Sequence, residues 1–486
     1  MGDFMNHSET QNEEISVLHR VFIDGEEKRV FPCRVSAIPF NVWWQGRQRP
    51  LEQSEEASIV SFVCHGPVCV RAIVSKEFHK VEVRPLSAGI VAEKLGNEVR
   101  FSIERPGQYV LETDNEHNAL HIFADPPRDF SGYGTPTLFF GPGVHRIGKI
   151  SLKSGDRVFL DRDAVVYGSF YAKGASDIKI YGFGILDGGW EDRKSMHCYE
   201  DYTNGCVKFY ECSDIRIEGP VFRNSAIWVV NLFDCENIVL QNVKIVGHYK
   251  YNTDGVDIVN SRRVVIRDCF IRSFDDSITL KGILQYKDKC VENILVENTV
   301  CWCGWGRTLE IGLETVAPAY RHIKFKNCDL IHNSAAALDI QAGDYAEISD
   351  LIFEDIRVEY QPYTLPEIID NPPGKKYDGY GKKHVPYLFC AENPSYFIND
   401  ETYKEYDEGL KEARVGKKGS LKGCRLNRVE AVGDAGGAKP TLKIQFTDDF
   451  YCESVEIKEL TIFGEKISDA KDCKTEGKSA DLLRFK

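Results

Sequence analysis

The chain has 486 residues, of which 42% are hydrophobic, so it is long enough to bury a large core. Its formal net charge is -13, and its isoelectric point lies near 5.5. This acidic balance argues against nucleic acid or an anionic membrane as the main partner. The sequence has no apolar run of the roughly 18 residues that a membrane span needs, so we expect no membrane partner.

Residues 1–16 are polar and acidic, and we expect them to form a flexible terminus. They contain no basic segment followed by an apolar run, which a secretory signal would need. The chain as it stands is therefore expected in the cytoplasm, and a secreted protein is expected only if a leader peptide has been removed.

Sixteen cysteines are scattered along the chain, several of them inside strand-like runs, such as Cys269, Cys301 and Cys328. This distribution favours reduced thiols in a core over a disulfide framework. Their spacing does not match a zinc site, so we expect neither a metal nor another cofactor.

Residues 17–124 alternate between apolar and polar side chains in short runs separated by Gly, Pro and Asn. The clearest runs are residues 59–63, 80–85 and 98–103. This pattern predicts an antiparallel β-sandwich. Residues 124–127 contain two prolines and are expected to link it to the rest of the chain.

A repeated strand unit dominates the remainder, residues 125–486. Its apolar anchors are Ile178, Ile215, Ile238, Val264, Ile294, Ile323 and Leu351. From Ile238 onward the anchors are 26, 30, 29 and 28 residues apart. Four residues after each anchor stands a turn-forming residue, namely Gly182, Gly219, Asn242, Asp268, Asn298, Asn327 and Asp355. Short strands at this period, without a helical pattern, predict a right-handed parallel β-helix.

The repeat is interrupted between about residues 360 and 423, where Pro- and Lys-rich and highly charged stretches occur. We expect a long insertion there, partly helical, that forms one wall of a groove.

Three acidic residues fall at related places in consecutive repeats: Asp254 in one, and Asp275 with Asp276 in the next. Adjacent coils of a β-helix lie about 4.8 Å apart, so we expect these carboxylates to converge. Crowded carboxylates raise one another's pKa, and such clusters serve for a shared proton, a metal, or a paired acid and base. The leading hypothesis is hydrolysis of a glycosidic bond.

The segments Asn252-Thr253-Asp254 and Asp275-Asp276, taken together, resemble the active-site signature of glycoside hydrolase family 28, the polygalacturonases. The resemblance covers roughly residues 135–360, and the N-terminal domain is similar to that of the related family 49, the dextranases and isopullulanases. It implies a parallel β-helix and an inverting mechanism. Asp275 would be the general acid, and Asp254 and Asp276 would activate the water. An inverting acid and base stand roughly 6.5–9.5 Å apart, which adjacent coils allow.

Two stretches depart from the family pattern. Gly304-Trp305-Gly306 stands where the family has Gly-His-Gly. Residues 338–341, which include Asp339 and Gln341, stand where the family has an Arg-Ile-Lys that holds the galacturonate carboxylate. An acid at that place predicts a neutral sugar instead of galacturonate. The predicted substrate-binding residues are Asn252, His248, Lys281, Trp305, Arg307, Glu310, Asp339 and Gln341.

The sequence thus predicts an inverting glycoside hydrolase that cleaves an α-glycosidic bond of its partner, a poly- or oligosaccharide, by exo action. Two other functions remain open: a polysaccharide lyase or epimerase acting on a uronic acid glycan, with calcium or a basic residue as catalyst, and a glycan-binding solenoid without catalysis. The oligomeric state is left open.

Overall fold

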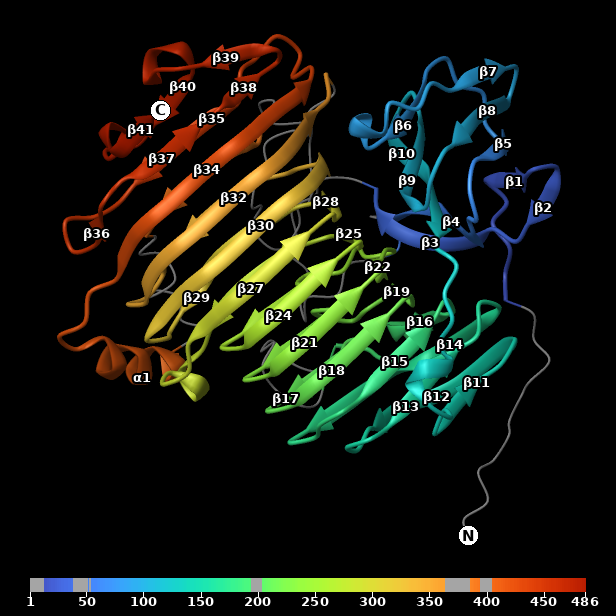
Figure 1. Ribbon diagram of the computed structural model, residues 1–486, viewed down its shortest axis with the longest axis horizontal. Coiled ribbons are helices and arrows are strands. Elements are labelled where there is room, and N and C mark those ends of the chain that lie inside the picture. The colour runs from blue at the N-terminus through green and yellow to red at the C-terminus, as the bar shows by residue number, and fades with distance from the viewer. Residues whose placement is uncertain (1–12, 38–50, 52–53, 194–202, 363–384, 394–403) are drawn as a thin grey trace.

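The computed structural model describes residues 13–37, 51, 54–193, 203–362, 385–393 and 404–486. An N-terminal β-domain lies beside a long parallel β-helix, whose strands form a broad twisted ribbon in Figure 1. The predicted fold, a parallel β-helix preceded by a sandwich of two sheets, is confirmed.

The N-terminal domain consists of two five-stranded sheets that enclose one apolar core. The first sheet runs in the order β2 (Glu26–Lys28), β1 (His19–Ile23), β5 (Val68–Val74), β8 (Glu98–Ile103) and β7 (Glu93–Leu95). The second runs in the order β3 (Phe31–Ser36), β4 (Ser54–Val63), β10 (Asn115–Asp125), β9 (Gly107–Thr113) and β6 (Val81–Arg84). Its strands pair antiparallel except β4 and β10, which are parallel.

The β-helix has three faces, which we name A, B and C. Face A contains β11 (Leu138–Phe140), β13 (Arg157–Leu160), β15 (Lys179–Gly182), β18 (Ser213–Glu218), β21 (Glu236–Gln241), β24 (Arg262–Arg267), β27 (Val291–Glu297), the first parts of β30 (Ala319–His332), β32 (Glu347–Tyr360) and β34 (Ser420–Gly433), and then β37 (Val455–Lys458) and β41 (Leu483–Phe485). Face B contains β12 (Gly143–Ser151), β14 (Ala164–Lys173), β16 (Ile185–Asp187), β19 (Val221–Arg223), β22 (Lys244–Ile245), β25 (Phe270–Ser273), β28 (Val300–Cys303), the ends of β30, β32 and β34, and then β38 (Leu460–Ile462) and β39 (Glu465–Ile467).

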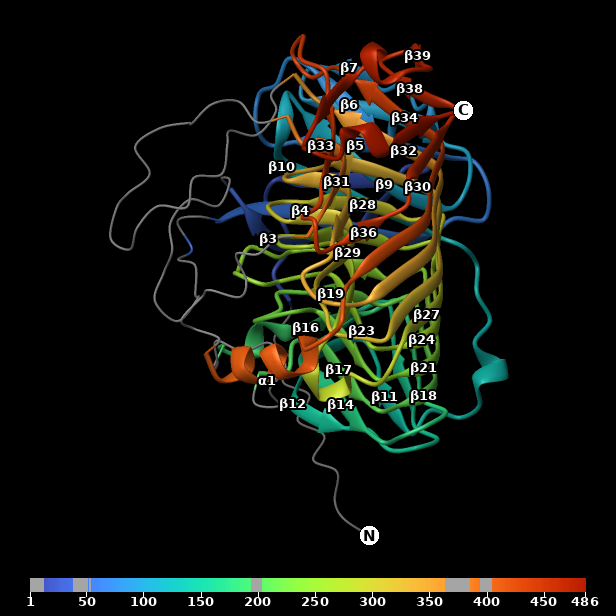
Figure 2. The same cartoon turned by 90° about the vertical axis from the view of Figure 1, so that its left-hand side faces the viewer.

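Face C, which carries the candidate site, begins at the end of β14. It continues through β17 (Val207–Tyr210), β20 (Val230–Phe233), β23 (Val256–Val259), β26 (Ile278–Gly282), β29 (Arg307–Thr315), β31 (Ala336–Gln341), β33 (Tyr387–Glu392), β35 (Thr441–Gln445) and β40 (Lys474–Glu476). The short β36 (Tyr451–Cys452) pairs with the start of β34. Figure 2 shows the coils stacked on one another from a second side.

The turn between faces A and B confirms the repeat prediction residue by residue. Asn242, Asp268, Asn298 and Asn327 have φ between 51° and 55°, in the left-handed region that Asn and Asp tolerate. A second left-handed position directly precedes each anchor at the start of face A. One of the residues at this position is a histidine, His322, with φ 56°. That second bend marks where each coil turns from face C into face A.

The N-terminal domain packs on face B through a shared apolar cluster that includes Ile59, Phe123, Phe270 and Trp302. Buried ion pairs reinforce this interface. Arg84 lies 2.7 Å from Glu112 within its own domain and also pairs with Glu359 of β32. The two domains therefore meet through a desolvated contact and not only through the linker.

Several predicted features fall partly outside the described residues. The predicted flexible terminus is described only from residue 13, where Glu13 pairs with Arg223 at 2.6 Å. Of the predicted insertion, residues 363–384 and 394–403 lie outside the description, and α1 (Lys404–Arg414) lies within its charged part. The cysteines among the described residues are all free thiols, and most are buried. In the described part of the chain, no helix is long and apolar enough to cross a membrane.

Candidate active site

The turn that carries Asp254 links β22 of face B to β23 of face C. Asn252 adopts a left-handed conformation with φ 52°, and the Thr253 hydroxyl donates to the carbonyl of Lys250 at 2.7 Å. Gly255 is required here, because a Cβ atom would lie 2.4 Å from the carbonyl oxygen of Ser277 on the next coil. The close approach of the two coils positions Asp254 next to the following turn.

That following turn carries Asp275 and Asp276 at the end of β25. The Ser273 hydroxyl donates to the carbonyl of Asp275 at 2.6 Å, and the backbone N–H of Asp276 donates to Oδ1 of Asp275 at 3.2 Å. The N–H of Gly255 donates to the carbonyl of Asp276 at 2.8 Å, which ties the two turns together. The predicted convergence of these three aspartates is therefore present in the structure.

The third coil supplies Gly304-Trp305-Gly306 and Arg307. The backbone N–H of Arg307 donates to Oδ1 of Asp276 at 2.7 Å. A Cβ atom on Gly306 would lie 2.2 Å from Oδ1 of Asp276 and 2.7 Å from Oδ1 of Asp275. Gly306 therefore leaves the space that both carboxylates occupy.

The protonation states of the aspartates differ from those of exposed carboxylates. Burial, with the charges of Asp254 and Asp276, raises the pKa of Asp275 well above its usual value. Burial raises the pKa of Asp254 to about 7, although Lys281 opposes the increase. Lys281 Nζ lies 2.7 Å from Oδ2 of Asp254. Burial lowers the pKa of Lys281, but the charges of Asp254 and Asp257 outweigh it and raise the pKa well above its usual value.

Asp257 also belongs to this cluster, although the sequence did not place it at the site. It lies in β23, is fully buried, and its Oδ1 is 2.8 Å from Lys281 Nζ. Asp257 thus shares Lys281 with Asp254, and a period-2 pattern alone does not indicate which strand residue takes such a place.

A ladder of polar residues runs along face C through consecutive coils. Register places Asp257 opposite Thr279, Thr279 opposite Glu310, and Glu310 opposite Asp339. Beyond it, Gln341 Nε2 donates to Oε1 of Glu392 at 3.1 Å. Four of the predicted substrate-binding residues, Lys281, Glu310, Asp339 and Gln341, thus lie on neighbouring strands of one face.

Glu310 and Asp339 are the most unusual pair on this ladder. Both are fully buried. The Asp276 carboxyl lies beside Glu310 and the Cys390 thiol beside Asp339, but among the described residues no hydrogen bond of good geometry reaches either carboxyl group. The Arg307 guanidinium is the nearest cation, at 3.3 Å from Asp339 and 3.9 Å from Glu310. Burial raises the pKa of Asp339 to about 7, and burial together with the charge of Asp276 raises that of Glu310 well above its usual value. Buried acceptors without donors are expected where a ligand supplies the donors.

Trp305 and His248 have different surroundings. Trp305 is partly exposed and stacks on Phe274 with ring centroids 5.7 Å apart. His248 was predicted to bind substrate, but it is 3% exposed and accepts a hydrogen bond from the N–H of Ser225 at 3.3 Å. Burial lowers its pKa to about 3, so it is a neutral residue beneath the turn.

Arg193 is a neighbour of the site that sequence reasoning missed. Its Nη1 donates to Oδ1 of Asn252 at 3.0 Å and to the carbonyl of Tyr251 at 3.2 Å. Asn252 Nδ2 in turn lies 3.5 Å from Oδ2 of Asp275. Arg193 stands in the longest gap of the repeat, where the periodic pattern offers no signal.

Comparison with known proteins agrees with this geometry. Residues 162–371 match the family described as glycosyl hydrolases family 28. A probable polygalacturonase of Arabidopsis thaliana is 24% identical over 41% of this chain and 45% of its own length. An exopolygalacturonase of Cochliobolus carbonum is 29% identical over 27% of this chain and 30% of its own length. The matches thus span less than half the length of these relatives.

Among solved structures, Dex49A from Penicillium minioluteum has a TM-score of 0.66 at 13% identity, and the match covers 98% of this chain and 96% of Dex49A. This likeness concerns the fold and includes the N-terminal domain. The predicted resemblance to family 28 in the β-helix is therefore confirmed, and the fold of the whole chain, with its N-terminal domain, is like that of Dex49A.

Proposed function

We propose that the protein is an inverting glycoside hydrolase in which Asp275 is the general acid and Asp254 and Asp276 activate the water. The observation that carries this proposal is that the three aspartates come together on two adjacent turns, with Lys281 paired to Asp254 and, among the described residues, in no ion pair with Asp275. A raised pKa keeps Asp275 protonated, as an acid catalyst requires, while Lys281 favours the charged form of Asp254.

Asp275 gives its proton to the glycosidic oxygen as the bond from that oxygen to the anomeric carbon breaks. A water molecule attacks the anomeric carbon from the opposite face and passes a proton to Asp254 or Asp276. The sugar is released with inverted configuration, and a proton returns from the base to Asp275 through solvent.

We propose a neutral sugar as the substrate, although the relatives named above are polygalacturonases. Glu310 and Asp339 support this, because ionised carboxylates repel a uronate and protonated or ionised ones hydrogen-bond well to hydroxyl groups. Arg307 is the only cation near this pair among the described residues, and it is already engaged by both carboxylates. A uronate would have to compete with them for it.

Exo action is supported by the position of the N-terminal domain. A Cβ atom on Gly247, seven residues before Asp254, would lie 2.9 Å from Cβ of Cys33, so the domain reaches the start of the catalytic turn. A wall at this place favours binding of a chain end over the middle of a polymer.

The test is hydrolysis of matched α-linked oligosaccharides, neutral and uronic, by the wild-type protein and by Asp275→Asn. We expect cleavage of a neutral substrate from one end, and a loss of about 10²- to 10⁴-fold in Asp275→Asn. Asp214→Asn, an exposed aspartate on face A, is the matched control and should keep full activity. Cleavage of uronic substrates alone would overturn the neutral-sugar proposal, and unsaturated products that absorb ultraviolet light would identify a lyase.

A further inference from the structure

A cavity of about 490 Å³ lies between the N-terminal domain and the β-helix, away from the aspartates. It opens where the turns between faces A and B meet the loop after β6 and the loop before β9. Small-molecule sites occupy roughly 300–1,000 Å³ and occur preferentially at domain interfaces. The size and place of this cavity fit such a site.

The wall formed by the β-helix is a row of side chains at one turn position on consecutive coils: Asp268, Asn298 and Asn327. Their left-handed backbones, with φ of 55°, 52° and 51°, direct these side chains outward. Asn298 Nδ2 donates to Oδ1 of Asp268 at 3.3 Å, and Asn327 Nδ2 donates to Oδ1 of Asn298 at 2.7 Å. Because an amide has two donor hydrogens and two acceptor lone pairs, these bonds leave capacity for a ligand.

The floor of the cavity carries an acceptor that lacks a donor. Gln108 is buried and donates from Nε2 to Oδ1 of Asn242 at 2.6 Å and to the carbonyl of Asp268 at 3.3 Å. Its Oε1 has no hydrogen-bond partner among the described residues. A buried acceptor of this kind is costly and is normally satisfied by a ligand hydroxyl or by water.

The opposite wall is mostly apolar, with Arg105 as its charged member, and the carboxylates of Glu218 and Asp329 in the lining are paired with arginines. Pro85, Pro106 and Tyr109 contribute rings from the N-terminal domain. The carboxylate of Glu218 pairs with Arg128 on one side of the cavity. Polar groups facing flat apolar rings, without an excess of charge, match a sugar, which presents hydroxyl groups at its edge and C–H groups on its faces.

We propose that this interdomain cavity is a second, non-catalytic binding site for a neutral oligosaccharide. It lies at the starts of β25 and β28, whereas the catalytic turns follow the ends of the same strands. A trisaccharide held at one site therefore does not occupy the other. The site extends the proposed function, but its detection does not depend on catalysis.

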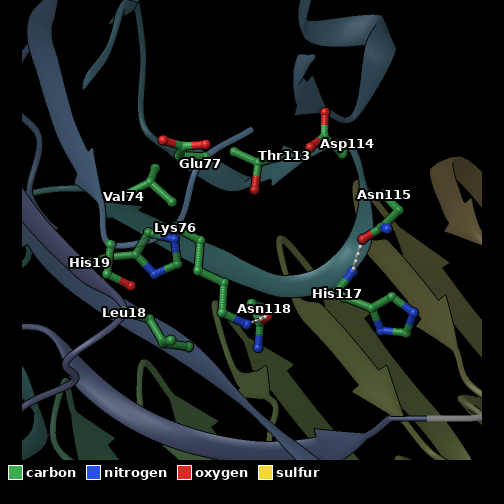
Figure 3. Close-up of a pocket in the computed structure, with 11 residues that line it drawn as sticks. Leu18, His19, Val74, Lys76, Glu77, Thr113, Asp114, Asn115, His117 and Asn118 are labelled. Carbon is green, nitrogen blue, oxygen red and sulfur yellow. Dashed lines mark hydrogen bonds between the residues drawn. The ribbon is translucent and has the colours of Figure 1, made fainter. Parts of the chain in front are cut away.

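The smaller cavity inside the N-terminal domain, about 190 Å³, is a weaker candidate (Figure 3). Its polar side chains bond to one another, as Lys76 does with Asn118, and the N–H of His117 donates to Asn115 at 2.9 Å. Its lining contains no buried orphan acceptor comparable to Gln108 among the described residues.

The test uses the full-length Asp275→Asn protein, titrated with isomaltotriose, maltotriose and trigalacturonic acid by calorimetry and NMR. The double variant Asn298→Ala/Asn327→Ala is compared with Asn293→Ala, an exposed, left-handed asparagine on the same coil outside the cavity. We expect two binding events for a neutral trisaccharide, and a loss of about tenfold in one of them for the double variant only. In the catalytically active background, the double variant should hydrolyse trisaccharides at the wild-type rate.

A single binding event for every neutral trisaccharide, or the same two affinities in the double variant, would overturn the proposal. An equal loss in Asn293→Ala, or tighter binding of trigalacturonic acid than of the neutral sugars at this site, would also overturn it. If Asp275→Asn still hydrolysed its substrate, the catalytic proposal would fail, while the comparison between the asparagine variants would remain valid.

Discussion

Lys281 should control the acid side of the pH–activity profile through Asp254. Its ammonium group lies 2.7 Å from Asp254 and 2.8 Å from Asp257, and the pKa of Asp254 is about 7 with this cation present. Asp254 must be ionised to take a proton from water, so activity falls as the pH drops through its pKa. An opposite charge at this range lowers a carboxyl pKa by about 1–3 units. Lys281→Met should therefore move the acid limb of kcat/KM upward by about 1–3 pH units.

The assay measures kcat/KM between pH 4 and 9 for wild type and Lys281→Met, with the oligosaccharide that the wild-type protein hydrolyses as substrate. At a pH below the acid limbs of both proteins, an upward shift of the limb by one pH unit reduces kcat/KM tenfold relative to wild type. A uniform loss of activity would instead lower kcat/KM equally at every pH. Lys208→Met is the matched control, because Lys208 is a buried lysine of face C, three strands away. Thermal unfolding of each variant verifies that it is folded. An acid limb at the wild-type pH in folded Lys281→Met would refute the reasoning.

Three further predictions concern stability and geometry. Burial raises the pKa of Asp339 from 3.8 to about 7, so the folded state binds more protons than the unfolded state between these values and loses stability as the pH rises. Asp339→Asn should thus stabilise the protein at pH 8, by at most about 4 kcal/mol, and have little effect at pH 4, as measured by urea unfolding. Gly306→Ala should reduce kcat about 100-fold with unchanged circular dichroism, because its Cβ would displace two aspartate oxygens, whereas Gly304→Ala, with its nearest atom at 3.4 Å, should be tolerated. Arg84→Met should destabilise the fold by about 3–5 kcal/mol in urea unfolding, because it leaves the buried Glu359 without its cation; an unchanged midpoint would contradict this.

The architecture could be predicted from the sequence because each coil repeats the same local chemistry. A turn residue four positions after each anchor, such as Asn242 or Asn298, is placed by its backbone conformation alone. The parallel pairing of β4 with β10 could not be predicted in the same way. Alternation indicates that a strand has two faces, but the partner and its direction are set by tertiary packing.

The part of the candidate site that lies at related positions of two consecutive coils could be predicted from the sequence, and the rest could not. Asp254 and Asp275 are brought together by coil stacking, which the period implies. His248 was misplaced and Asp257 was not recognised, because a sequence pattern shows neither which side of a turn a residue faces nor how deeply it is buried. Arg193 was missed, since it comes from a segment outside the repeat.

The most direct test of the central claim is the anomeric configuration of the first product, followed by NMR during hydrolysis of a neutral α-linked oligosaccharide. With Asp275 as acid and Asp254 and Asp276 activating water, the β-anomer appears first and the α-anomer only later, by mutarotation. Initial release of the α-anomer would mean a covalent intermediate on one of the aspartates, and it would contradict the account.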